Sequence, residues 1–150
     1  MEEIRSKIDD RVLHLVHRMA EMRKPGRDFP SRVDIVPPEH GLQVSCLKLM
    51  NEQTFKPHKH IPRPREIPIT QECWIVVMGI VRVTYYDTDD TIIGYRTLNP
   101  GDVSITLEGA GHTYKAFTTP TFVYECKTGP FVGVEADKVL IGADSAESED

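Results

Sequence analysis

Residues 72–107 read ECWIVVMGIVRVTYYDTDDTIIGYRTLNPGDVSITL, and this stretch decides the fold class. Short runs rich in Val, Ile, Thr and Tyr alternate here with the turn sequences DTDD and NPGD. Runs of this length and composition, bounded by turn residues, predict β-strands. The run at 72–78 is apolar on both faces, which favours a strand buried on both sides. The stretch therefore predicts an all-β sandwich or barrel built from short strands.

The same pattern extends to both sides of this stretch. We expect strands at 42–50, 72–78, 80–86, 91–98, 103–107, 112–117 and 121–127, with short pieces near 131–134 and 138–141. Residues 2–23 instead carry apolar side chains at helical spacing, which predicts one amphipathic helix that ends at Pro25 and Gly26. We therefore divide the chain into an N-terminal helix and connector (1–41), a barrel (42–141) and an acidic disordered tail (142–150).

The composition is that of an ordinary globular domain. The chain has 150 residues, of which 39% are hydrophobic and 27% charged, enough for one domain with its own core. Its net charge of −5 gives no indication of nucleic acid or membrane as a partner. The N-terminus is charged from its second residue and lacks the apolar segment of a signal peptide, so we expect a cytoplasmic protein. We expect the three cysteines to be reduced thiols.

Three histidines and one glutamate form the constellation that carries chemistry. His58 and His60 share one face if their segment is extended, because alternate side chains of a strand point the same way. Glu72 opens the strand at 72–78, and His112 follows the Gly-rich turn EGAG. Three imidazoles with one carboxylate suit a divalent transition metal, namely Mn, Fe, Co, Ni or Zn.

The ordered set resembles the cupin superfamily over roughly residues 42–135. The first cupin motif resembles HKH (58–60) followed by ECWIVVMG (72–79), and the second resembles PGDVSITLEGAGH (100–112). The resemblance implies a jelly-roll barrel, the cupin double-stranded β-helix, in which His58, His60, Glu72 and His112 are the metal ligands. Cupins usually leave three or four residues between the paired histidines and the glutamate, whereas eleven intervene here.

This insertion leaves two rivals for the carboxylate position, Gln71 and Glu66. Glu72 is preferred because its spacing to Gly79 is that of the family, and because it starts a buried strand. The insertion carries Pro62, Pro64 and Pro68, so we expect a stiff loop that leaves the barrel mouth and returns to deliver Glu72.

Residues around the four ligands are candidates for catalysis and substrate binding. We assign candidate catalytic roles to Tyr114, two positions after His112, and to Lys56, which shares the face of the paired histidines. A barrel-rim aromatic is the alternative role of Tyr114. Candidate substrate-binding residues are Arg63, Arg65, Trp74 and Tyr124. The two arginines suit capture of carboxylate or phosphate, which favours a small, anionic carbohydrate ligand; a solvated loop is their alternative.

More narrowly, VDIVPPE, FKPHKH, DVSITLEG and YECKTGPF resemble small single-domain cupins associated with cell-surface polysaccharide and nucleotide-sugar pathways. Three function classes follow. The first is a metal-assisted isomerase or epimerase acting on a sugar or nucleotide-sugar, the second an Fe(II)-dependent oxygenase, and the third a non-catalytic metal- or sugar-binding module. The basic loop favours the first. Cupins commonly form dimers, so we expect a homodimer.

Overall fold

The computed structural model describes residues 1–26, 28, 30–64, 66–130 and 133–142. The chain is mostly antiparallel β-sheet, and its described helices are each four residues long. The strands are β1 (Glu2–Arg5), β2 (Val12–His17), β3 (Arg32–Asp34), β4 (Ser45–Leu47), β5 (Glu72–Met78), β6 (Val81–Tyr86), β7 (Ile92–Leu98), β8 (Val103–Thr106), β9 (Gly111–Ala116) and β10 (Phe122–Lys127), and the helices are α1 (Met19–Met22) and α2 (Val134–Asp137). None of these helices could span a membrane.

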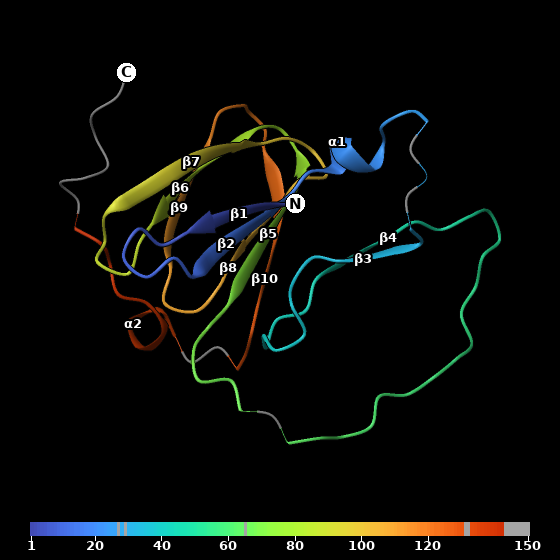
Figure 1. Cartoon of the computed structure of the whole chain (residues 1–150), viewed down its shortest axis with the longest axis horizontal. Coiled ribbons are helices and arrows are strands. Elements are labelled where there is room, and N and C mark those ends of the chain that lie inside the picture. Colours follow the sequence, from blue (N-terminus) through green and yellow to red (C-terminus); the bar gives the residue numbers. More distant parts are fainter. Residues whose placement is uncertain (27, 29, 65, 131–132, 143–150) are drawn as a thin grey trace.

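Two of the sheets face each other and enclose the main core (Figure 1). One has the strand order β1-β2-β8-β5-β10 and the other the order β7-β6-β9. Their facing side chains form an apolar cluster of Ile4, Val16, Val76, Val81, Val83, Tyr85 and Leu98. Gly79 makes the turn between β5 and β6 with a φ of +88°, and a Cβ there would collide with Thr118 and Thr121. This tight turn sends the chain from one sheet into the other.

The outer face of the five-stranded sheet has a core of its own. Leu15, Cys73, Val103, Ile105 and Leu107 pack there against Ile35 and Val36 from the segment that carries β3 and β4. The middle of this sheet is therefore covered on both faces, which explains why β5 reads as apolar throughout.

The prediction of an N-terminal helix over 2–23 is wrong. These residues form β1 and β2, and only α1 is helical. The sequence VLHLVH (12–17) alternates between two buried faces, with Leu13 and Leu15 on one side and His14 and Val16 on the other. Because β2 pairs with β8, this segment belongs to the same sheet as the strands of the expected barrel, and burial on both faces outweighs the helical spacing.

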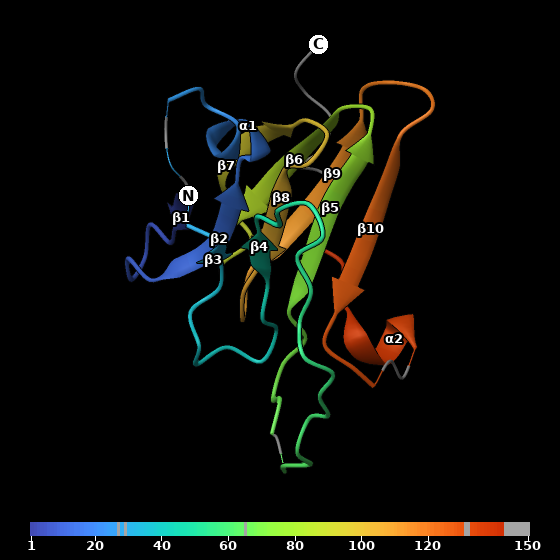
Figure 2. The ribbon, with the colours of Figure 1, turned by 90° about the vertical axis from the view of Figure 1, so that its right-hand side faces the viewer.

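Most other strand predictions are confirmed, from β5 through β10. The run at 42–50 is a strand only at β4, and the piece at 138–141 is not a strand. Of the piece at 131–134, residues 131–132 lie outside the described residues, as does the expected tail from 143 onward. The described strands form three open sheets, so the expected closed barrel is not seen among them. Residues 48–64 and 66–71 lie in an extended loop that runs away from the sheets (Figure 2).

Candidate functional site

A pocket of about 410 Å³ lies at one end of the space between the two main sheets. Its walls come from the starts of β5 and β9, the ends of β6, β8 and α2, and residues 138–142. Ile141 lies against Gly111, where a Cβ would come within 2.5 Å of its Cδ1 atom. Residues 138–142, which we call the strap, form one wall of the pocket.

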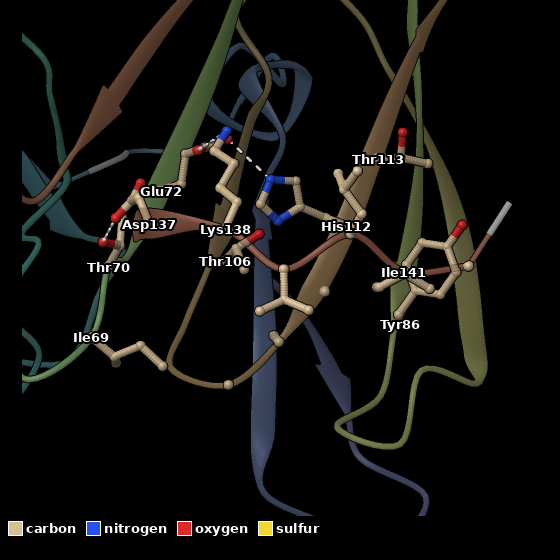
Figure 3. Close-up of a pocket in the computed structure, with 16 residues that line it drawn as sticks. Ile69, Thr70, Glu72, Tyr86, Thr106, His112, Thr113, Asp137, Lys138 and Ile141 are labelled. Carbon is tan, nitrogen blue, oxygen red and sulfur yellow. Dashed lines mark hydrogen bonds and ion pairs between the residues drawn. The ribbon is translucent and has the colours of Figure 1, made fainter. Parts of the chain in front are cut away.

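Glu72 and His112 meet inside this pocket (Figure 3). Glu72 is the first residue of β5 and His112 the second residue of β9, so they come from opposite sheets. His112 Nε2 donates to Glu72 Oε1 over 3.0 Å, and Trp74 Nε1 donates to the same oxygen over 2.8 Å. Lys138 Nζ lies 3.8 Å from the other oxygen, Oε2. The buried carboxylate of Glu72 thus accepts two hydrogen bonds and has one cation nearby.

These neighbours determine the charge of Glu72. Burial acts to raise its pKa, but the hydrogen bonds from His112 and Trp74 and the positive charge of Lys138 outweigh burial, so the pKa of Glu72 is lowered. The group is therefore an ionised carboxylate at neutral pH, oriented toward an imidazole.

A stack of aromatic rings lies behind this pair. The rings of Trp74 and Tyr114 are nearly parallel, with centroids 3.7 Å apart, and the ring of Tyr114 lies edge-on to His112 at 5.1 Å. The hydroxyl of Tyr114 is buried, and burial raises its pKa well above the usual value, although an interaction with the Ser104 hydroxyl acts to lower it. Tyr114 and Trp74 thus lie beside the predicted ligands, behind the pocket wall rather than in the lining.

The structure does not bring His58 and His60 to the other two predicted ligands. Their rings, 5.5 Å apart, lie on the exposed part of the loop at 48–71, where His58 Nδ1 contacts the backbone oxygen of Lys56. Among the described residues no group of three or more His, Cys, Asp or Glu is placed to hold a metal ion. The four-ligand centre remains a prediction.

The other predicted site residues are dispersed. Lys56 and Arg63 are exposed on the loop, and Arg65 lies outside the described residues. Tyr124 faces away from the pocket on β10 and is 68% exposed, which leaves its predicted substrate contact without support in this arrangement.

The rivals for the carboxylate position lie away from the pocket. Gln71 is buried on the other side of the sheet, where its Oε1 accepts from the Leu42 backbone and its Nε2 contacts His40 Nδ1. Glu66 is exposed on the loop. Of the three candidates, Glu72 alone lines the pocket with His112.

Sequence reasoning missed the contribution of the strap. Lys138 faces Glu72, and Asp137 accepts a hydrogen bond from Thr70 Oγ1 over 2.6 Å and lies 3.8 Å from Lys127 Nζ. The sequence predicts a strand piece at 138–141, and a single Asp-Lys pair is too common to indicate a site. Comparisons with protein-family models, curated proteins and solved structures find no match for this chain.

Proposed function

We propose that this chain is a divalent-metal-binding protein of the cupin type that acts as an isomerase or epimerase on a sugar or nucleotide-sugar. The observation that carries the proposal is the buried Glu72–His112 pair inside the pocket, with 3.0 Å between Oε1 and Nε2. Carboxylate and imidazole are the donors that first-row divalent metals take in proteins. Without such a pair, the pocket would indicate ligand binding but not a metal site.

The spacing of this pair fits shared coordination of one ion. Metal–ligand bonds of about 2.1 Å at angles between 90° and 109° place two ligand atoms about 3.0–3.4 Å apart. The pair at 3.0 Å meets this condition with little movement. His112 Nδ1 is buried without a hydrogen-bond partner among the described residues, so the ring is held through Nε2 alone and can adjust.

The remaining two donors would come from the loop at 48–71. His60 lies twelve positions before Glu72, and an extended chain of that length spans up to about 40 Å, so the loop can fold back to the pocket. Phe55 and Ile61 flank the histidines and are 56% and 74% exposed, which makes burial of this stretch favourable. Within the described strands β9 pairs only with β6, so its other edge is open to the segment around His58.

When bound, the metal would supply Lewis-acid activation of a sugar carbonyl or diol. The chain's own residues would bind and orient the substrate: Thr106 and Thr113 belong to the lining, as do the apolar residues Leu140 and Ile141. Basic residues on the loop, among them Lys56, Lys59 and Arg63, would bring positive charge to an anionic carbohydrate as the loop closes. A homodimer and a cytoplasmic location belong to the same proposal.

The test is elemental analysis of protein purified without chelator or nickel resin. We expect about one divalent transition metal per chain, lost in Glu72→Gln and His112→Ala and weakened in His58→Ala. Glu66→Ala, which removes an exposed loop carboxylate, is the matched control and should keep its metal. Full metal content in both pocket variants would refute the proposal. Bound iron together with O₂ uptake would instead favour the oxygenase. Binding of a nucleotide-sugar without its turnover would favour a binding module.

A further inference from the structure

Lys138 is the cation of the pocket. It directly follows α2, and its ammonium group points into the cavity toward Glu72 (Figure 3). Of the described residues that line the pocket, Lys138 is the only lysine or arginine. Its side chain is 43% exposed whereas that of Glu72 is 6% exposed, so the ammonium group has one side toward Glu72 and another toward the open cavity.

The contact between Lys138 and Glu72 is loose. At 3.8 Å the separation of Nζ and Oε2 is longer than a hydrogen bond, so the attraction is electrostatic and the ammonium hydrogens are available to another acceptor. The better acceptor, Oε1, already receives hydrogen bonds from His112 and Trp74.

The neighbouring acid, Asp137, does not compete for Lys138. One of its oxygens accepts from Thr70 Oγ1, and the other lies 3.8 Å from Lys127 Nζ. Among the described residues, Glu72 is therefore the counter-ion of Lys138. A divalent cation on Glu72 and His112 would neutralise that carboxylate and repel the ammonium group, which would then need a different anion.

We propose that Lys138 binds the carboxylate of a small sugar acid whose hydroxyl groups face the Glu72–His112 pair. This inference rests on the proposed function and narrows its substrate class. The described lining also holds Glu72, His112 and Asp137, and Lys138 is its single ammonium group. One ammonium group suits a monoanion, because phosphate sites in proteins usually combine several donors such as arginine forks or helix N-termini. Since the cation frees Lys138, metal and acid bind with positive coupling, each raising the affinity for the other.

The experiment is calorimetric titration of Mn(II)-loaded and metal-free protein with D-glucuronate and with D-glucose, which has the same ring and no acid. We expect glucuronate to bind the loaded protein at least tenfold more tightly than glucose, and more tightly than it binds the metal-free protein. Lys138→Met should remove the preference for the acid, a loss of about ten- to hundred-fold. Lys115→Met is the matched control, because Lys115 is exposed opposite Arg82 and outside the pocket lining.

The outcomes separate this inference from the function on which it rests. The sugar-acid site is refuted, and the metal site retained, if the protein takes up Mn(II) normally but does not bind glucuronate. The same conclusion follows if wild type and Lys138→Met bind glucuronate equally well. Failure to take up Mn(II), with glucuronate binding that still depends on Lys138, retains the acid site and refutes the metal proposal. Failure of both measurements refutes both.

Discussion

The buried His14 should make this fold sensitive to mild acid. Its side chain is fully buried on β2, with Nδ1 3.3 Å from Thr106 Oγ1, Nε2 3.5 Å from the Tyr86 carbonyl oxygen, and its ring 4.4 Å from that of Tyr85. Burial lowers the pKa of His14 to about 3; the Tyr86 carbonyl and the charge of Asp87 act the other way without restoring it. In the folded protein His14 is therefore neutral across the ordinary pH range.

This pKa fixes the sign and size of the effect. The unfolded chain binds a proton at His14 below about pH 6.5, whereas the folded chain does so only near pH 3, so acid stabilises the unfolded state. Stability is complete above pH 6.5 and falls by about 1.4 kcal/mol per pH unit below it. Between pH 7 and pH 5 the loss due to His14 alone is about 2 kcal/mol.

Urea unfolding of metal-free protein, followed by fluorescence of the single tryptophan, Trp74, measures this loss. His14→Gln keeps a neutral polar side chain of similar size, so its stability should fall by about 2 kcal/mol less than that of wild type between the two pH values. Burial also lowers the pKa of His17, but that contribution is common to both proteins and cancels in the difference. Equal losses in wild type and His14→Gln would refute the reasoning.

Three further predictions concern the strands and the strap. Glu2→Gln should lower the free energy of unfolding by about 1 kcal/mol at neutral pH, because the carboxylate pairs with two arginines at 2.6 Å; an unchanged urea midpoint would contradict this. A thiol reagent should label the exposed Cys126 in the native protein and spare Cys73, where burial raises the pKa to about 12; equal labelling rates would contradict the burial of Cys73. Gly111→Ala should push the Cδ1 end of the Ile141 side chain aside and crowd Tyr86 Cβ, 3.1 Å away, at a cost of about 1 kcal/mol; retention of wild-type thermal stability would show that both neighbours adjust freely.

The strands from β5 to β10 could be predicted because their signal is local. Alternating β-branched and aromatic residues between DTDD and NPGD specify strand and turn without reference to the rest of the chain. The cupin resemblance predicts that Glu72 and His112 meet. Their approach depends on the pairing of β5 with β8 and of β9 with β6. The approach of Lys138 had no local signal, because it depends on where the chain passes after α2.

The N-terminal residues show why spacing alone misled. Ile4, Ile8, Val12, Leu15 and Val16 recur at helical intervals, yet Ile8 is 59% exposed in the turn between β1 and β2 and contributes nothing to a core. The decisive fact is that β2 fills the position beside β8, where both of its faces are buried and its backbone is paired. The sequence of the N-terminal residues does not show that β8 has an edge available for pairing. Pairing with that edge is what makes residues 12–17 a strand.

The described residues of the loop at 48–71 form no strand pairing, although the edge of β9 is open to them. Its apolar side chains are exposed and its histidines lie away from the pocket, while β9 has one unpaired edge within the described strands. An open edge and an exposed apolar segment in one chain are each unfavourable in water, and pairing them would relieve both. Binding of a metal ion by Glu72 and His112 would add a specific reason for His58 and His60 to approach that edge. Metal binding and loop closure should therefore be one cooperative event, so that removing either loop histidine weakens the metal site and removing the metal leaves the loop open.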